Sequence, residues 1–213
     1  MAVDRRAEVL QAAIRIFGKE SYSAASVQAL ANALNMPKAT LYHYIKSKED
    51  LLSKIFETSH QEMNSLIGEV ATSGLSAIER LRYFVEQYVS WTIANLDKAN
   101  IYSREWRYLT GDLRDHVIDR RTKLDKFMIS LIDAAKAEGA IDPVLDSRRA
   151  AYFLWGSISS VPDWYRPDGP ESPEAIARSY GVLALNVVRG ETPVPGPGAV
   201  SSGNSAHSAV QTG

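Results

Sequence analysis

Apolar residues in this chain recur every three or four positions, and no segment sustains the alternation of apolar and polar residues that is typical of a strand. The first such series is Val9, Ala13, Ile16 and Phe17, which predicts a helix that ends near Gly18. Because the periodic segments share this helical spacing from one end of the chain to the other, the sequence predicts an all-α fold.

Polar start signals divide the first third of the chain into four predicted helices. Ser26 is a candidate N-cap of the second helix, and Pro37 suits the first turn of the third, where its missing N–H is not needed. Ser47, followed three residues later by Asp50, resembles a capping box and predicts the start of a fourth helix. Beyond Gly74 we expect longer amphipathic helices over residues 76–97, 101–109, 112–138, 146–161 and 173–189.

The net charge of −1 is unevenly distributed along the chain. Residues 1–54 contain eight Lys and Arg against five Asp and Glu, whereas the remainder contains 16 against 20. A basic N-terminal segment followed by an acidic remainder predicts a polyanionic partner for the N-terminal segment only.

Several classes of protein are disfavoured by what the composition lacks. The absence of cysteine excludes disulfides, thiol catalysis and thiolate metal sites. The start of the chain has no apolar signal segment and no later run is apolar enough for a membrane span, so we expect a cytoplasmic protein with no membrane partner. Residues 191–213 are rich in Gly, Pro and Ser and are predicted to be a disordered tail.

The second and third predicted helices have the pattern of a helix-turn-helix. Leu30, Leu34 and Leu41 would be buried between them, and Ala31 faces the partner helix where a larger side chain would hold the two apart. Asn35 falls in the connection, and asparagine tolerates the left-handed backbone that a tight turn requires. These residues predict a compact three-helix unit at the N-terminus.

The outward side of the third helix carries polar groups that can form hydrogen bonds in a DNA major groove. With Leu41 and Ile45 turned inward, the residues between them face away and offer donors to base edges and phosphates. Lys48 opposes the dipole of the fourth helix, which makes sense if that helix end meets a phosphate. The alternative is a solvated face that happens to be basic. The predicted DNA-binding residues are Ser26, Gln28, Pro37, Lys38, Ala39, Thr40, Tyr42, His43, Lys46 and Lys48.

The segment SVQALANALNMPKATLYHYIKSKEDLL resembles the N-terminal signature of the TetR family of bacterial transcriptional regulators. The resemblance covers about residues 5–55 and includes the small-residue LA pair, the turn, the TLY core, the His/Tyr pair and KSKEDLL. Three positions depart from the usual pattern: Asn35 and Ala39 stand where Gly is common, and Ile45 stands where Phe is usual.

The resemblance implies a homodimer with an all-helical ligand-binding domain behind the DNA-binding domain. We expect a three-helix helix-turn-helix domain over residues 1–50 and an effector-binding and dimerisation domain over residues 51–190. The last two long helices, 146–161 and 173–189, are apolar on more than one face, which predicts that each packs on its own core and on a symmetry mate. The alternative is that both faces pack inside one chain.

Large side chains in the middle of the chain are candidates for an effector site. They combine apolar surface with occasional polar groups and are spread over helices that would surround a central cavity. Side chains of this kind are more often plain core. The candidates are Tyr88, Trp91, Tyr102, Trp106, Arg107, Phe127, Met128, Tyr152 and Trp155.

Two further stretches, SREWRYLTGDLRDHVIDRR and VPDWYRPDGPESPE, resemble a TetR subgroup related to regulators of cholesterol-ring and fatty acid catabolism. That resemblance implies a repressor released from its operator by an acyl-coenzyme A effector, with Arg104, Arg107 or Arg121 as phosphate partners. Ion pairs with Glu105 or Asp125 would explain the same arginines. The alternative function is a TetR-type regulator of an efflux or aromatic-compound pathway that responds to a free hydrophobic molecule.

An enzyme and an architectural DNA-coating protein are the competing classes. The chain has neither a phosphate-binding glycine loop nor a nucleophile elbow, and its four histidines lie in separate contexts. Asp115, His116 and Asp119 could suggest a metal site, but such spacing more often marks the wet face of a helix, and we expect no metal and no cofactor. An architectural protein would leave the aromatic-rich C-terminal domain without a role.

Overall fold

The computed structural model describes residues 4–190, and every regular element in that range is helical. The N-terminal elements are α1 (Arg5–Glu20), α2 (Val27–Ala33) and α3 (Lys38–Leu41). They are followed by α4 (Lys48–Thr72), α5 (Ala77–Ala94), α6 (Leu96–Arg104), the 3₁₀ turn η1 (Glu105–Tyr108), α7 (Gly111–Ala137), α8 (Ser147–Ser159), α9 (Val161–Trp164) and α10 (Pro173–Arg189). The predicted all-α fold is confirmed, and the predicted tail, 191–213, lies outside the described residues.

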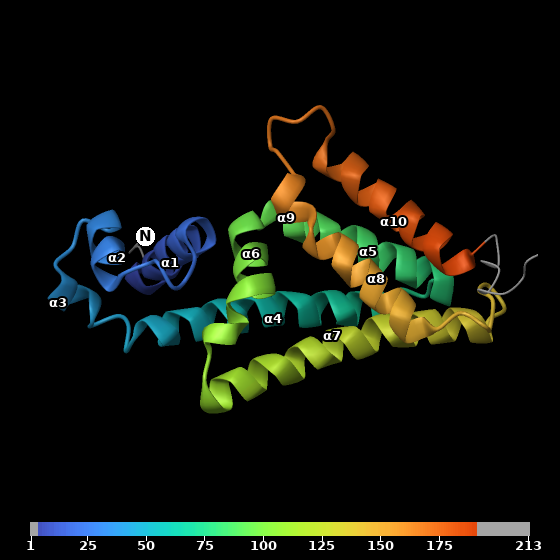
Figure 1. Ribbon diagram of the computed structural model, residues 1–213, viewed down its shortest axis with the longest axis horizontal. Coiled ribbons are helices and arrows are strands. Elements are labelled where there is room, and N and C mark those ends of the chain that lie inside the picture. The colour runs from blue at the N-terminus through green and yellow to red at the C-terminus, as the bar shows by residue number, and fades with distance from the viewer. Residues whose placement is uncertain (1–3, 191–213) are drawn as a thin grey trace, which may run out of the picture.

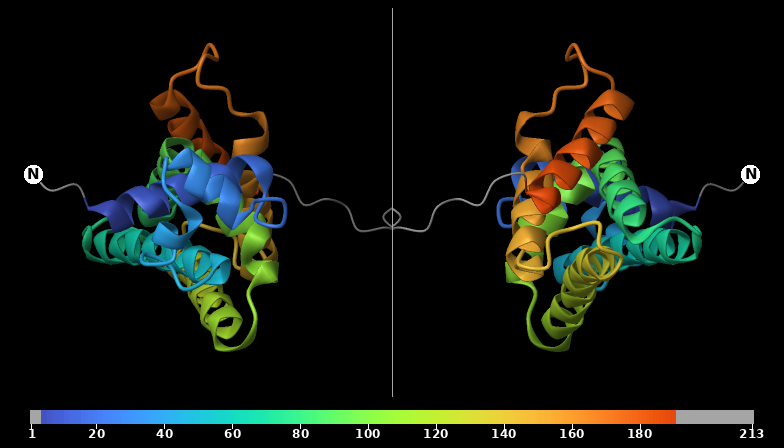
Figure 2. Two further views of the ribbon diagram at one scale, coloured as in Figure 1. Left: turned by 90° about the vertical axis from the view of Figure 1, so that its left-hand side faces the viewer. Right: turned by 90° about the vertical axis from the view of Figure 1, so that its right-hand side faces the viewer.

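The helices form two groups along the long axis of the molecule (Figure 1). We call α1 to α3 the head and α4 to α10 the body. The long helix α4 begins beside the head and extends into the body, while α5 packs against α4, α7 and α10. Seen from either end, α7 and α10 lie at opposite edges of the body (Figure 2). No helix within residues 4–190 is long and apolar enough to cross a membrane.

The head is a helix-turn-helix, as predicted. The Ser26 hydroxyl oxygen accepts a hydrogen bond of 3.0 Å from the Ala29 N–H and so caps α2. Asn35 has φ of 50°, in the left-handed region, and the Met36 N–H donates to the Ala31 carbonyl oxygen across the turn. Leu30 and Ala31 are fully buried, so the close packing expected of this motif is present.

The third helix is shorter than its sequence suggests. Pro37 is the residue before α3, not part of its first turn, and the α-helix ends at Leu41. The N–H groups of His43 and Tyr44 donate to carbonyl oxygens three residues back, so the segment continues as tight turns. These turns still bring Ile45 into the core, where it is 3% exposed.

Two other predicted helix boundaries are wrong. α1 continues past Gly18 to Glu20, and Gly18 lies directly against Asp97 of α6. The predicted helix over 101–109 is instead α6, which begins at Leu96, followed by η1. Asn95 separates α5 from α6, and its side-chain amide donates to the Trp91 carbonyl oxygen at the end of α5.

The last helix is apolar on two sides, and only one of them packs inside the chain. Ala177, Gly181 and Ala184 are buried on the side of α10 that faces α5. Leu183 is 55% exposed on another side, and Phe153 of α8 is 63% exposed. The alternative in which both faces pack within one chain is therefore wrong for these residues.

Candidate DNA-binding face and effector cavity

The predicted DNA-binding residues lie at the start of α2, along the α3 segment and at the first residue of α4. Tyr42 is 49% exposed, and its neighbours in the α3 segment are exposed or half-buried because Leu41 and Ile45 occupy the inner side. Exposed members of the predicted set are Ser26, Gln28, Pro37, Lys38, Ala39, Tyr42, His43 and Lys46, and half-buried members are Thr40 and Lys48. The arrangement offers hydroxyl, imidazole and ammonium donors on one short segment, which suits base edges and phosphates.

Lys48 has partners that the sequence did not suggest. Its ammonium donates hydrogen bonds of 2.7 Å and 2.9 Å to the carbonyl oxygens of Tyr22 and Ala25, and it lies 4.2 Å from the centre of the Tyr22 ring. Those carbonyls belong to the connection between α1 and α2. In the free protein Lys48 therefore ties this connection to the start of α4, and a contact with a phosphate remains a prediction.

The start of α4 is capped much as predicted. The Ser47 hydroxyl oxygen accepts from the Asp50 N–H at 3.0 Å, while the Asp50 carboxylate accepts from the Lys46 N–H instead of that of Ser47. Burial is the largest single influence on the Asp50 carboxyl and raises its pKa, but the hydrogen bonds from Lys54 and Lys46 and the charges of both lysines together outweigh it, so the pKa is lowered. The predicted domain boundary at residue 50 falls inside this continuous helix.

The body encloses a cavity of about 280 Å³ bounded by α5, α6, α7, α8 and the beginning of α9. Five of the nine predicted effector residues line it: Tyr88, Trp91, Tyr102, Tyr152 and Trp155. Tyr88 and Trp155 pack edge to face with their ring centroids 4.9 Å apart. Their rings form a rigid aromatic wall that suits an apolar group.

The other four predicted effector residues do not line this cavity. Met128 is fully buried in the core, and Phe127 packs edge to face on Phe84. Trp106 lies outside the cavity on η1, next to the exposed Arg107. Aromatic character alone therefore did not separate cavity wall from core.

The cavity has lining residues that the sequence analysis did not select for it: Thr92, Ala99, Ser103, Arg121, Leu124, Asp125, Ile158, Ser159 and Pro162. Several of them could have been predicted from the spacing of residues on a helix. Thr92 follows Tyr88 by four positions, and Ile158 and Ser159 follow Trp155 by three and four. Residues with this spacing share a helix face, so extending each predicted residue by one turn would have found them.

The cavity is apolar inside and polar where it meets the surface. Its inner lining includes the buried Tyr88, Leu124 and Ile158, whereas Tyr152 and Ser159 are exposed. Among the half-buried and exposed lining residues, which also include Trp91, Trp155 and Pro162, we call the following polar ones the mouth: Ser103, Arg121, Asp125, Tyr152 and Ser159. The shape suits a ligand with an apolar end inside and a polar end toward solvent.

Burial changes the proton affinities of groups around the cavity. It raises the pKa of Tyr88, and it raises the pKa of Tyr102 to about 12 despite the opposing charge of Arg121. Burial also raises the pKa of the Asp125 carboxyl, while the positive charges of Arg121 and Arg148 oppose that rise. The tyrosines are therefore neutral hydroxyl groups at physiological pH, able to donate and accept hydrogen bonds.

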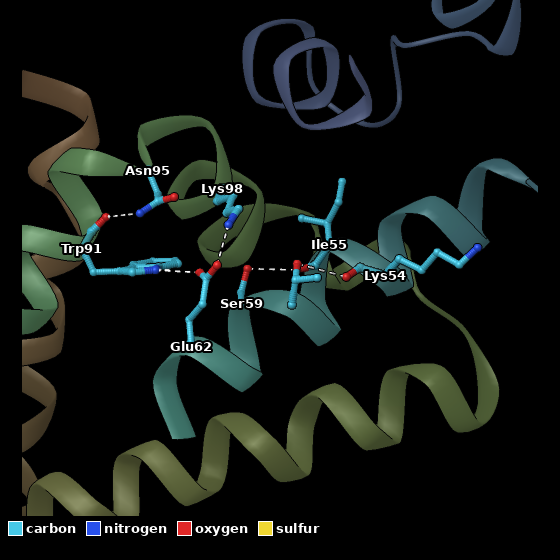
Figure 3. Close-up of polar contacts among 8 residues, drawn as sticks. Lys54, Ile55, Ser59, Glu62, Trp91, Asn95 and Lys98 are labelled. Carbon is cyan, nitrogen blue, oxygen red and sulfur yellow. Dashed lines mark hydrogen bonds and ion pairs between the residues drawn. The ribbon is translucent and has the colours of Figure 1, made fainter. Parts of the chain in front are cut away.

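Glu62 of α4 connects one wall of the cavity to two other helices (Figure 3). Its carboxylate accepts a hydrogen bond of 2.8 Å from the Trp91 indole N–H and forms an ion pair of 2.8 Å with Lys98. Trp91 lies on α5 and Lys98 on α6, so this one side chain joins three helices around a cavity residue. Its partners are 29 and 36 positions away in sequence, and no local pattern predicts such a contact.

A second link between the cavity and α4 passes through a buried histidine. His60 is 3% exposed, and its Nε2 lies 3.1 Å from the hydroxyl oxygen of the cavity residue Tyr102. Its Nδ1 lies 3.3 Å from an Arg120 nitrogen, while Arg121 donates to the Tyr102 carbonyl oxygen. Burial, followed by the charges of Arg120 and Arg121, lowers the pKa of His60 to about 4, so the ring is neutral at physiological pH.

One contact joins the head to α6, and a second joins the start of α4, the helix that follows the head, to the residue before α7. A Cβ atom on Gly18 of α1 would lie 2.6 Å from the Asp97 Cβ of α6, so the two helices touch closely there. The Glu49 carboxylate accepts hydrogen bonds from the N–H and the hydroxyl of Thr110, the residue that precedes α7. A movement of α6 would therefore displace α1, and a movement of α7 would displace the start of α4.

The residues considered for a metal site are arranged differently. Asp115, His116 and Asp119 are exposed on α7, and the His116 Nδ1 lies against the Asp112 carbonyl oxygen of its own helix. Within residues 4–190, no three His, Asp or Glu side chains are grouped so that they could hold a metal ion.

Comparisons with known proteins agree with this architecture. Residues 9–55 match the family model described as "Bacterial regulatory proteins, tetR family", and residues 74–188 match the model described as "Tetracyclin repressor-like, C-terminal domain". The chain is 24% identical over 183 residues to the HTH-type transcriptional repressor KstR2 of Rhodococcus jostii, covering 85% of this chain and 90% of the relative. It is also 24% identical over 185 residues to the fatty acid metabolism regulator protein of Bacillus subtilis, covering 84% and 92%.

Solved structures show the same fold. The ketosteroid transcriptional regulator KstR2 of Mycobacterium tuberculosis superimposes with a TM-score of 0.83 at 21% identity, covering 90% of this chain and 98% of that one. AibR, solved in complex with isovaleryl coenzyme A and operator DNA, superimposes with a TM-score of 0.76 at 24% identity, covering 87% and 98%. With both family models matched in chain order, the second across more than half of the sequence, the chain belongs to the TetR family of bacterial transcriptional regulators.

Proposed function

We propose that this protein is a transcriptional repressor that binds a palindromic operator as a homodimer and leaves it when a coenzyme A thioester binds in the body cavity. The observation that carries the effector part is the cavity of about 280 Å³, which is apolar inside and polar at its mouth. The proposal gives the protein no catalytic role, and the family and the named relatives are regulators.

The size of the cavity restricts the acyl group. Ligand pockets commonly span about 300–1,000 Å³, so 280 Å³ lies at the small end of this range. A whole thioester of coenzyme A is far too large to be enclosed, whereas a short, branched or single-ring acyl group fits. The nucleotide then lies outside the mouth. The acyl group would then lie against the buried Leu124 and Ile158, and the nucleotide beyond the half-buried Arg121 and Asp125.

The DNA-binding part rests on the exposed face of the α3 segment. Tyr42 and His43 would meet the major groove, with Lys38 and Lys46 near the flanking phosphates. In a two-fold symmetric dimer the two faces contact half-sites about 34–36 Å apart, one turn of the DNA, so the operator is expected to be an imperfect palindrome.

The contacts between cavity and head supply a route for release. An acyl group against Tyr102 and Ala99 presses on α6, and α6 touches α1 at Gly18. His60 and Glu62 connect the same helix to α4, which carries the head. A coupling free energy of about 1–3 kcal/mol would lower operator affinity by roughly 5- to 150-fold.

The test is a fluorescence-anisotropy titration of the protein on the DNA upstream of its own gene, at one fixed salt concentration. We expect tight binding that is released by a thioester with a short or single-ring acyl group and not by the matching free acid. Ala99→Leu, which fills part of the cavity from α6, should retain operator binding but lose its response to the thioester.

Three other outcomes would argue against the proposal in different ways. Release by free acids or other uncharged aromatic compounds, and not by thioesters, would instead support a regulator with a free hydrophobic effector. Equal release of wild type and Ala99→Leu would place the effector outside this cavity. Failure to bind the upstream DNA or other palindromes selected from random sequence would contradict the repressor itself.

A further inference from the structure

Three arginines surround the side chain of Trp106 just outside the cavity. The guanidinium carbons of Arg107, Arg121 and Arg114 lie 4.9, 5.5 and 5.9 Å from the centre of the indole ring. Arg107 comes from η1, whereas Arg114 and Arg121 come from α7. Such contacts hold cations in place without neutralising their charge. We call Trp106 and the three arginines Arg107, Arg114 and Arg121 the arginine cluster.

Among residues 4–190, the three arginines of the arginine cluster form no ion pair with an acid, although Asp125 lies one turn beyond Arg121 and lines the same cavity. Arg104, close by in sequence, pairs with Asp163. Arg114 and Arg121 are seven positions apart and share one side of α7. By the same helical period Asp112, Asp115 and Asp119 fall on other sides of α7, whereas Asp125 falls on the side of Arg121.

Arg121 connects the arginine cluster to the cavity. It belongs to the mouth, and its Nη1 donates a hydrogen bond of 2.8 Å to the Tyr102 carbonyl oxygen. The guanidinium also lies 5.2 Å from the centre of the Tyr102 ring. A ligand that passes from the cavity to the surface at this point therefore meets Arg121 first and then Arg107 and Arg114 beside Trp106.

We propose that the arginine cluster is a subsite for the phosphate groups of the coenzyme A nucleotide, continuous with the cavity that takes the acyl group. The proposal rests on the proposed function, since the cavity supplies the other half of the ligand. Guanidinium groups are planar, permanently charged and able to donate two parallel hydrogen bonds to a phosphate, which makes them suited to this role. The cluster would recognise the part of the ligand that coenzyme A thioesters share, while the cavity would select among acyl groups.

The test measures nucleotide binding separately from acyl binding. Isothermal titration calorimetry at low salt would compare free coenzyme A with pantetheine, and isovaleryl-coenzyme A with isovaleryl-pantetheine. The variant is the double substitution Arg107→Ala with Arg114→Ala, which leaves the cavity residue Arg121 in place. Lys123→Ala is the matched control, because Lys123 is an exposed cation of α7 on the side away from Arg114.

We expect wild type to bind each coenzyme A compound at least about tenfold more tightly than its pantetheine counterpart, a difference that the loss of one charge-assisted contact can produce. The double variant should lose this preference and bind the pantetheine compounds as wild type does, while Lys123→Ala keeps it. Retention of operator binding by the double variant would show that it is folded and that the cluster does not serve as a DNA contact.

The outcomes separate the subsite from the proposed function. Arginine-dependent binding of free coenzyme A, without release of the operator by any thioester, supports the subsite and contradicts the effector proposal. Release of the operator by a thioester that binds no better than its pantetheine analogue overturns the subsite and leaves the effector proposal intact. A double variant that is folded, keeps its affinity for coenzyme A and loses affinity for the operator also overturns the subsite, because the arginines would then contact DNA.

Discussion

Tyr42 and Lys48 are six positions apart, and both were predicted to contact DNA, yet the structure places them differently. Tyr42 is 49% exposed, whereas Lys48 is half-buried and its ammonium donates to two carbonyl oxygens. A buried carbonyl that loses its donor costs about 1–3 kcal/mol. The two side chains should therefore contribute to different properties of the protein.

We predict that Tyr42→Ala weakens operator binding and leaves thermal stability unchanged, whereas Lys48→Met lowers the free energy of unfolding by about 1–3 kcal/mol. Methionine keeps the length of the lysine side chain but provides no N–H donors. Thermal unfolding and anisotropy titrations of both variants at one salt concentration would check this pair. A Lys48→Met protein as stable as wild type would show that the two carbonyl contacts do not contribute to stability. It would then favour a role for Lys48 in DNA binding.

His60 is a buried base whose proton affinity is reduced by its surroundings. Burial and the charges of Arg120 and Arg121 lower its pKa to about 4, against about 6.5 for an exposed histidine. Between these two pH values the unfolded chain binds a proton that the folded protein does not. The contribution of His60 to stability is thus complete above pH 6.5 and is lost progressively as the pH falls toward 4.

We predict that replacing His60 with Asn makes stability less dependent on pH between 6.5 and 4. The difference in unfolding free energy between wild type and variant should change by at most about 1.4 kcal/mol per pH unit, the limit for one proton. Urea unfolding at a series of pH values measures this difference. His43→Asn is the control, because its ring is exposed on the head. Parallel curves for wild type and His60→Asn would contradict the inference.

At the scale of elements, α6 is the helix shared by the cavity and the head. Ala99, Tyr102 and Ser103 line the cavity from one side of α6, while Asp97 meets Gly18 of α1. The fit depends on the absence of a side chain at Gly18, since a Cβ there would lie 2.6 Å from the Asp97 Cβ and 2.8 Å from its Cα. Contacts below 3 Å of this kind require a backbone to move.

We predict that Gly18→Ala separates α1 from α6 and lowers the free energy of unfolding by about 1–3 kcal/mol, the usual effect of overpacking. Gly68→Ala is the matched control: Gly68 is exposed within α4 and has open space around its Cβ position. There the substitution should stabilise the helix by about 0.5–1 kcal/mol. Chemical denaturation compares the two, and an equal gain in stability for both would refute a tight contact between α1 and α6.

The head could be predicted well because its signals are local. Ser26 and Ser47 cap helices within three residues of themselves, and Asn35 adopts the left-handed conformation at a single position. The cavity could be predicted only in part because its walls come from helices that are far apart in sequence. The partners of Glu62 and the carbonyls bound by Lys48 depend on how helices pack, and a single sequence has no pattern that specifies them.

At the scale of the whole molecule, α8 and α10 each expose large apolar side chains. Phe153 on α8 and Leu183 and Val182 on α10 are between 52% and 63% exposed, and the opposite sides of both helices are buried in the same chain. Exposed apolar groups gathered on neighbouring helices are typical of a protein interface. A second copy of this chain, related by a two-fold axis, would cover each of these faces with the same face of its partner.

We predict that Leu183→Glu combined with Phe153→Glu converts the dimer into a monomer, because two carboxylates would be buried near their symmetry equivalents. Analytical ultracentrifugation would measure the change in mass, and circular dichroism would confirm that the helices are retained. The matched control is Leu113→Glu on α7, the helix at the opposite edge of the body from α10 (Figure 1), which should leave the mass unchanged. Since a monomer binds only one half-site, operator affinity should fall by about a hundredfold or more in the double variant alone. A double variant that keeps both the dimer mass and the operator affinity would place the interface on another face of the body.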